Sequence, residues 1–541
     1  MTVARSVADV LADHVTLEVA CIDRMFLNVY QPRLQHVNGV VAFFRGHRGA
    51  AYASSALMDP ISKDFIASLN RFARDRQVPM VDFVRGQRKD DVAHDYLRVF
   101  EAGGGTQGVL FIGRAQEKAR VFRTEKRRNP LTGASYPWIV SATGIVNQFY
   151  VYAVDEDFGP FFLKFCSYFP YNAKLCINGN EWAKRQAAKA GIGFTALDNG
   201  FAACQDPAGL QRICNRLSAA KIDALLRKWL AILPHPFTRA DRIAGYRYDI
   251  SMLQVEFSLT QTLDRPVSGR VLFEEVLREN LDIGRPDKIG LIFDRKIVRR
   301  GPRATPGRFR TRVLTEGVTP SLHVDYKHSK IKQYHKEGRA LRTETTINDS
   351  HDFNIGKRLC NLPELAQVGF DANRRLLDVE RLTSDPTIGT DAFRAVADPI
   401  VINNQRASAL PFDSARTQAL LSALVVFRLH PHGFRNTDLR ALLAPLLGCD
   451  PSLMTQGRMS YDLRRLRLHG LIERIPGTHR YTVTDRGFRL AVFLTRVHNR
   501  LLRPGLSDIL TTTDIDSALQ RALHHIDAVI DNAASKHRLI A

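Results

Sequence analysis

The sequence lacks several patterns that would each define a class of protein. It has no Cys-X-X-Cys pair, and its seven cysteines are odd in number and scattered, which argues against a disulfide framework or a zinc knuckle. Such cysteines are typical of reduced thiols in the cytosol. No apolar run approaches the ~20 residues of a membrane span, and the first residues carry no apolar segment of the signal-peptide type. We therefore expect a cytoplasmic protein without a membrane partner.

Signatures of common enzymes are missing as well. No GxxxxGK[ST] loop occurs, which argues against a nucleotide-driven motor, and no nucleotide cofactor is indicated. No GxSxG, HExxH or protein-kinase signature occurs either. Any chemistry must therefore come from residues outside these motifs.

Acidic residues are scarce relative to basic ones. There are 77 Lys and Arg against 55 Asp and Glu, a formal net charge of +22. Such an excess favours a polyanionic partner, because binding phosphates releases condensed counterions. We expect DNA, RNA or both as the partner. Neither the choice between them nor the oligomeric state follows from the sequence.

The length of 541 residues predicts three to four domains, and the pattern indicates an α+β multidomain protein. In its N-terminal part, GVVAFF (39–44) is typical of a short buried strand, and Ser62 is a candidate cap of a helix that runs to Arg76. The expected units are an α/β unit over 1–129, an aromatic and basic α+β unit over 130–235, a strand-rich unit over 236–408, a helix-rich unit with two strands over 409–506, and a helical tail over 507–541.

The segment 414–506 has the clearest pattern. Three helices are expected first, then two strands around a Pro476–Gly477 turn, then a last helix. The stretch LRRLRLHGLIERIPGTHRYTVTDRG resembles the winged helix-turn-helix of MarR-like bacterial DNA-binding domains, and the resemblance covers about 90 residues. It implies that the third helix enters the major groove and that the wing contacts backbone or minor groove. A winged helix used for protein–protein contact is the alternative.

The resemblance also assigns individual residues. It places Leu463, Leu466 and Leu471 in the core. The residues it places on the recognition helix and wing are Arg458, Tyr461, Arg464, Arg465, Arg467, Arg474, His479 and Arg480.

A basic hairpin is predicted within 322–349, where side chains alternate with period two around Glu337–Gly338. A three-residue loop would pair Tyr334 with Arg342 and Lys332 with Glu344, whereas a two-residue loop would place them on opposite faces. We favour the first register, because it gives Lys332 a carboxylate partner. The expected nucleic-acid contacts are Lys330, Lys332, Tyr334, Lys336 and Arg342. A solvated strand face is the alternative.

Two further stretches suggest binding surfaces. In the stretch 295–312, eight of eighteen residues are Arg or Lys and none is acidic, which predicts a basic loop with contacts from Arg299, Arg300 and Arg303. The stretch 158–186 is rich in aromatics. We assign most of 158–169 to a core, and we expect its edge to stack bases through Trp182, Lys184 and Arg185, beside Tyr168 and Tyr171.

A metal-dependent nuclease requires convergent carboxylates, often with a lysine. The preferred metal ligands are Asp23, Asp90 and Glu117, for Mg²⁺ or Mn²⁺. Asp90 and Asp91 are equally suited to stabilise a helix N-terminus. The whole candidate catalytic set is Glu18, Asp23, Lys89, Asp90, Asp91 and Glu117. The alternatives are a cluster of His323, Asp325 and His328, the pair Asp287 and Asp294, and a tyrosine nucleophile at Tyr168 or Tyr334.

These patterns together favour a nucleic-acid-binding protein of a bacterial or mobile-element system. We expect a C-terminal winged helix to recognise duplex, and basic middle surfaces to hold a strand or RNA. Metal-dependent phosphodiester cleavage in the N-terminal unit is the expected chemistry, if there is any. A non-enzymatic regulator, or the protein component of a ribonucleoprotein, is the alternative.

Overall fold

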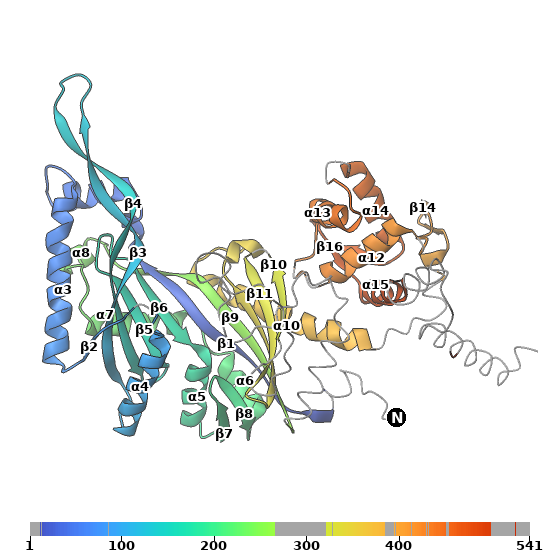
Figure 1. Cartoon of the computed structure of the whole chain (residues 1–541), viewed down its shortest axis with the longest axis horizontal. Helices are drawn as coiled ribbons and strands as arrows, with labels where there is room; N and C mark the ends of the chain where they lie inside the picture. The colour runs from blue at the N-terminus through green and yellow to red at the C-terminus, as the bar shows by residue number, and fades with distance from the viewer. Residues whose placement is uncertain are drawn as a thin grey trace, which may run out of the picture. The chain divides into compact units, whose positions relative to one another are not determined.

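The computed structural model shows a mixed α/β protein with one large sheet (Figure 1). It describes residues 13–84, 86–265, 321–326, 328–384, 396–412, 414–428, 432–450 and 454–498, and the single positions 11, 394, 430 and 525. The described residues divide after Arg374 into two compact units, here called the sheet unit and the C-terminal unit. No described helix is long and apolar enough to cross a membrane.

The sheet unit is built on ten strands in the order β10-β11-β12-β9-β1-β6-β5-β4-β3-β2. Neighbouring strands are antiparallel except β2 and β3, which are parallel. The strands are β1 (Val15–Tyr30), β2 (Met80–Asp82), β3 (Gly108–Arg128), β4 (Ser135–Asp155), β5 (Gly159–Cys166), β6 (Ala173–Asn178), β9 (Asp249–Leu263), β10 (Ser321–Tyr326), β11 (Ser329–Lys336) and β12 (Ala340–Ile347).

One face of this sheet is packed, and the other is open in part, since Arg342, Ser258 and Thr260 lie on it by register and are buried. On β1, Met25, Leu27 and Val29 are completely buried, whereas Phe26 and Asn28 between them are half-buried. This alternation follows from the two-residue period of a strand. We call the second side the open face. By strand register it carries Arg24, Phe26, Asn28, Phe162, Lys164, Lys174, Cys176, Gln254, Glu256, Lys330, Lys332, Tyr334 and Glu344.

Helices cover the packed face through aromatic contacts. Phe65 of α3 meets Phe165 edge-on, with ring centroids 5.9 Å apart, and Trp229 of α7 meets Phe161 at 5.0 Å. On the opposite side, α4 covers the sheet only at its β3–β4 end, where Tyr96 packs on Phe111. The helices of this unit are α2 (Val37–Ala42), α3 (Met58–Asp75), α4 (Lys89–Ala102), α5 (Gly179–Lys189), α6 (Pro207–Cys214), α7 (Ala219–Ile232), α8 (Arg239–Ile243) and α10 (Leu362–Ser384). Helix α10 extends past Arg374. Two short strands, β7 (Phe194–Leu197) and β8 (Gly200–Cys204), pair with each other.

The three units expected over 1–129, 130–235 and 236–408 are not separate. β1 pairs with β6 on one side and with β9 on the other, so one sheet joins all three segments. Local periodicity cannot reveal this joining, because strand partners are chosen over long distances in sequence. Two local expectations are also wrong. Residues 39–44 lie in α2 and the helical turn after it, and Ser62 lies inside α3, where its hydroxyl donates to the Met58 carbonyl at 3.1 Å.

β3 and β4 extend beyond the rest of the sheet as a two-stranded ribbon (Figure 1). β2 pairs with β3 only at 112–114, and β5 pairs with β4 only from Gln148 onward. The ribbon packs on the core up to Phe122 and Ile139, both buried. We call the part beyond these residues, Glu125 to Trp138, the β-arm.

The C-terminal unit has three helices, then a two-stranded antiparallel sheet, then a fourth helix. These are α12 (Ala415–Phe427), α13 (Asn436–Leu446), α14 (Gln456–Leu468), β15 (Ile472–Arg474), β16 (Tyr481–Val483) and α15 (Asp485–Val497), preceded by the strand pair β13 (Ile400–Ile402) and β14 (Gln405–Ala407). Leu463, Leu466 and Leu471 are buried as expected. The Thr455 hydroxyl caps α14 by accepting from the Arg458 amide at 3.3 Å.

Candidate functional site

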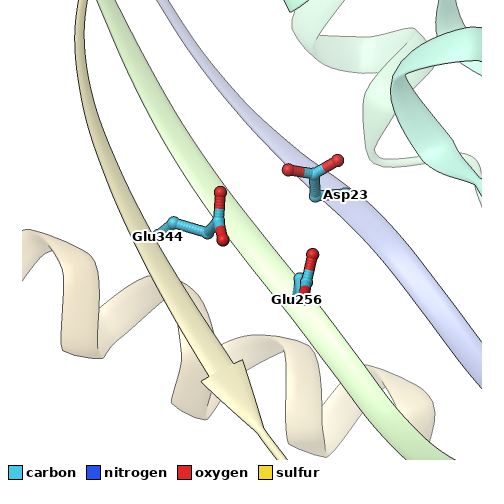
Figure 2. Close-up of side chains that lie close together, drawn as sticks. All are labelled: Asp23, Glu256 and Glu344. Carbon is cyan, nitrogen blue, oxygen red and sulfur yellow. The ribbon is translucent and has the colours of Figure 1, made fainter. Parts of the chain in front are cut away.

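Three carboxylates meet on neighbouring strands of the sheet unit. Asp23 of β1, Glu256 of β9 and Glu344 of β12 each offer an oxygen within 4.8 Å of the others (Figure 2). The β1 register shifts between Ile22 and Met25, which leaves Asp23 and Arg24 together opposite Glu256. This bulge turns Asp23 toward the other carboxylates, as bulges beside functional residues often do. We call these three residues the acidic cluster.

A buried arginine holds two members of the acidic cluster. The Arg342 guanidinium is completely buried, forms an ion pair with Asp23, and lies 3.5 Å from the Glu344 carboxylate. Asp23 also accepts hydrogen bonds from the amides of Asn199 at 2.7 Å and Asn180 at 3.3 Å. The buried charges of Asp23 and Arg342 are therefore paired with each other, and an unpaired charge at this depth would be strongly destabilising.

Glu256 is the member whose protonation changes near neutral pH. Burial, together with the charges of Glu344 and Asp23, raises the pKa of Glu256 to about 7. A carboxyl group with this pKa can donate or accept a proton at neutral pH. Arg24 lies close by: burial lowers its pKa, but the charges of Asp23, Glu256 and Asp90 outweigh burial and raise it.

The acidic cluster has the donor chemistry of a Mg²⁺ or Mn²⁺ site, because hard oxygen ligands suit these ions. Asp23, Glu256 and Glu344 would hold the ion. Arg342 already supplies one positive charge there, so a bound cation would compete with its guanidinium for Asp23 and Glu344. Glu256 is the carboxylate least committed to that arginine.

A basic cleft lies on the same sheet beside Lys164 and Lys174. Its volume is about 460 Å³. Four cations line it, and its lining includes no carboxylate. Partial burial and the charge of Lys164 lower the pKa of Lys174, and they outweigh the opposing charge of Glu117, which pairs with Lys164. The polar residues that line this basic cleft are Lys118, Arg120, Lys164, Lys174, Asn28, Gln35, Gln148 and Asn172.

The expected metal site of Asp23, Asp90 and Glu117 does not form. Asp23 on β1 and Glu117 on β3 are four strands apart in the sheet, which at about 4.8 Å per strand is roughly 19 Å. Glu117 instead accepts hydrogen bonds from Lys89 and Tyr150, both at 2.5 Å, and from Lys164. Burial would raise its pKa, but these bonds outweigh burial and lower the pKa to about 2.

The other candidate catalytic residues are dispersed. Glu18 accepts a hydrogen bond from Gln261 at 2.8 Å, away from any described metal-like group. Asp90 and Asp91 occupy the first turn of α4, where negative charge stabilises the helix. In the alternative histidine cluster, His328 contacts Asp352 at 3.2 Å, and the Asp325 side chain lies outside the described residues. The alternative pair Asp287 and Asp294 also lies outside the described residues.

The hairpin has the favoured register. Tyr334 faces Arg342 and Lys332 faces Glu344, with Glu337 to Arg339 in the turn. The expectation that Arg342 contacts nucleic acid is wrong, because its guanidinium is buried against Asp23 and is not available to a phosphate. Lys330 is exposed, and the Lys332 ammonium lies 4.2 Å from the Tyr334 ring centroid. Lys336 pairs with Glu337 at 3.1 Å.

The surface expected to stack bases at the edge of the stretch 158–186 does not form. Trp182 is 3% exposed and packs beside Phe158, and Tyr171 is completely buried. Lys184 donates to the Leu197 and Asp198 carbonyls at 2.9 Å, so it fixes the chain after β7. Arg185 lies 3.8 Å from Glu101. Core packing therefore accounts for this stretch, while Arg299, Arg300 and Arg303 lie outside the described residues.

In the C-terminal unit, the expected contact residues divide into two groups. Arg458, Arg464 and Arg467 are exposed on α14 and form no ion pair with a described residue. The others make contacts within the unit. Arg465 donates to the Ser408 and Ala409 carbonyls, and the Tyr461 hydroxyl lies 2.9 Å from the Ser408 hydroxyl. The expectation that Arg465 contacts nucleic acid is therefore wrong, because its guanidinium holds the segment before α12.

In the two-stranded sheet, Arg474 donates to the Thr478 carbonyl at 2.7 Å and lies 3.4 Å from His479. Arg480 donates to the Gly433 carbonyl at 3.1 Å.

Comparison with protein families, with curated proteins and with solved structures finds no match for this chain. Sequence reasoning missed Glu256, Glu344 as a site residue, and the cation Lys164. A usable signal was present for Glu344, whose predicted strand also carries Arg342. None was present for Glu256, because its neighbours in space are far away in the sequence.

Proposed function

We propose that this protein binds nucleic acid, with a winged helix in the C-terminal unit that recognises duplex and a second surface in the sheet unit that holds a single strand. The observation that carries the proposal is the surface of α14, with Arg458, Arg464 and Arg467 exposed and unpaired among the described residues. Its one acidic residue, Asp462, is buried and paired with Arg416 at 2.5 Å. The charged residues on the exposed side of α14 are therefore all basic.

The arrangement around α14 supports duplex recognition. Arginine forks can bond a guanine edge or a phosphate in two places at once, which lysine cannot do as specifically. The end of β15 and the turn after it add Arg474 and His479 as exposed residues of the proposed wing. A multidomain arrangement, with this unit reading duplex separately from the sheet unit, follows from the same proposal.

The open face and the basic cleft are suited to an unpaired strand. Phe26, Phe162 and Tyr334 are half-buried on a face that also carries lysines. Exposed rings beside cations let bases stack while the cations follow phosphates, the combination used for single strands and RNA. The basic cleft supplies Lys118, Arg120 and Lys174 for the phosphates, while Lys164 is already paired with Glu117.

Binding to a labelled duplex, followed by fluorescence anisotropy across a salt series, tests the proposal. If about five phosphates are neutralised, log Kd should rise with log salt with a slope of about 4 to 5. A single-stranded oligonucleotide should compete poorly with the duplex if the two occupy different surfaces. A flat salt slope, or no binding of either nucleic acid at low salt, would contradict the proposal.

A second candidate function is metal-dependent phosphodiester cleavage at the acidic cluster, which three carboxylate oxygens within 4.8 Å favour. A cation there would activate water or stabilise the charge of the leaving oxygen. Because Glu256 must lose its proton to bind, and its pKa is about 7, Mn²⁺ affinity should increase as the pH rises from 6 to 8.

Titration of Mn²⁺, followed by its proton relaxation enhancement, measures that affinity. Glu256→Gln should weaken Mn²⁺ binding at least tenfold and remove its pH dependence near 7. Glu117→Gln is the matched control, because Glu117 lies in a separate lysine network. Equal Mn²⁺ affinity in wild type and Glu256→Gln would exclude the acidic cluster as a metal site.

A further inference from the structure

The β-arm is a ribbon that only its own two strands hold together. Beyond Glu117 and Val146, β3 and β4 pair with each other and with no other described strand. Between the pair Thr124–Ile139, of which Ile139 is buried, and the last pair Arg128–Ser135, each strand advances four residues, which is about 14 Å. The β-arm therefore projects far enough from the core to enter a groove of a partner.

The ribbon is strongly basic on one strand. From 115 to 147 there are six Lys or Arg and two Glu, and all eight lie on β3. Arg127 lies 4.5 Å from the Trp138 ring, which orders its guanidinium. Near the ribbon's base, Lys118 and Arg120 also line the basic cleft. The cations are Lys118, Arg120, Arg123, Lys126, Arg127 and Arg128.

The tip of the β-arm is ordered and apolar. The side-chain oxygen of Asn129 accepts a hydrogen bond from the backbone amide of Leu131 at 2.9 Å. The backbone carbonyl of Asn129 accepts one from the backbone amide of Gly133, also at 2.9 Å. Gly133 has a φ of +67°, a conformation that glycine adopts without strain. This turn presents Pro130 and Leu131, and Leu131 is 94% exposed. At this exposure the Leu131 side chain, held at the end of the β-arm, is available to contact a partner.

We propose that the β-arm enters the minor groove of duplex DNA and that Leu131 wedges between adjacent base pairs, so that the DNA bends. The inference rests on the proposed binding of duplex. Ribbons of two strands are used to enter DNA grooves. Apolar residues at such tips, leucine and proline among them, unstack a base step and kink the duplex. The cations from Arg123 to Arg128 contact the phosphates on either side of the groove.

The test measures bending separately from affinity. A short duplex carries a fluorescent donor at one end and an acceptor at the other, and energy transfer is recorded with the full-length protein. Wild type should raise the transfer efficiency on binding. Leu131→Ala should remove most of this rise while weakening affinity less than tenfold, because the phosphate contacts remain.

Ile145→Ala is the matched control. Ile145 is 69% exposed on the same ribbon but lies near its base, so this variant should bend DNA as wild type does. Equal bending by Leu131→Ala and wild type would overturn the wedge, and so would binding of duplex without any change in transfer. Complete absence of duplex binding would overturn the proposed function as well. Binding without bending would overturn the wedge alone, so the experiment distinguishes failure of the wedge from failure of the proposed function. Circular dichroism should be unchanged, since Leu131 packs against nothing.

Discussion

Replacing Arg458, Arg464 and Arg467 together by alanine is expected to weaken duplex binding by at least 100-fold at physiological salt. Each lost arginine contact to a base edge or phosphate should cost about 1–3 kcal/mol, so three contacts cost at least about 3 kcal/mol. The slope of log Kd against log salt should also fall by up to about 3, since up to three phosphate contacts are removed. Anisotropy titrations at several salt concentrations measure both quantities.

A matched triple variant separates the α14 surface from total charge. Arg440 of α13 and Arg486 and Arg489 of α15 are exposed arginines of the same unit, outside α14. Replacing these three removes the same charge but should cost less than tenfold in affinity. Similar losses in the two triple variants would mean that net charge, rather than the α14 surface, determines binding. If neither variant lost affinity, the C-terminal unit would act as a protein-contact scaffold.

Replacing Arg342 by alanine is expected to destabilise the sheet unit by about 3–5 kcal/mol. The change leaves Asp23 and Glu344 without their shared cation, and breaking a buried pair from one side strands an uncompensated charge. Urea unfolding followed by tryptophan fluorescence measures the loss, because Trp182 and Trp229 are buried in this unit.

Two companion variants define the cause of that loss. Asp23→Asn in the Arg342→Ala background should recover part of the stability, because it removes the stranded charge. Arg24→Ala, at the partly exposed neighbour on the same bulge, should cost less than Arg342→Ala, because the Arg24 side chain still reaches solvent. A cost below 1 kcal/mol for Arg342→Ala itself would show that the acidic cluster does not depend on this arginine.

The sequence predicted the features that local pairing determines. The register of the 322–349 hairpin was predictable, because one loop length gave Lys332 a carboxylate opposite it, and the structure has that register. Leu463, Leu466 and Leu471, which the resemblance placed in the core, are buried on α14 and just after it. In these cases the deciding interactions lie within a few residues or across one turn.

Features determined over long distances were not predictable. Asp23 and Arg342 are 319 positions apart, and no local pattern shows that they touch. Trp182 beside Lys184 and Arg185 resembles a stacking surface in the sequence, yet its indole lies in the core while the cations face other partners. The run at 39–44 was too short and apolar for its period to separate helix from strand. Local patterns of spacing and composition do not resolve these cases, because the deciding contacts are distant in sequence.

The position of β12 has a consequence for synthesis of the chain on the ribosome. β9 lies between β1 and β12, so until residues 340–347 emerge its outer edge has no partner. β9 is fifteen residues long, and its second half is entirely buried in the finished sheet. A long unpaired strand edge of this kind pairs readily with other chains. Fragments that end between 265 and 340 should therefore aggregate, whereas the complete chain covers β9 with β12 and places Arg342 beside Asp23 in the same step.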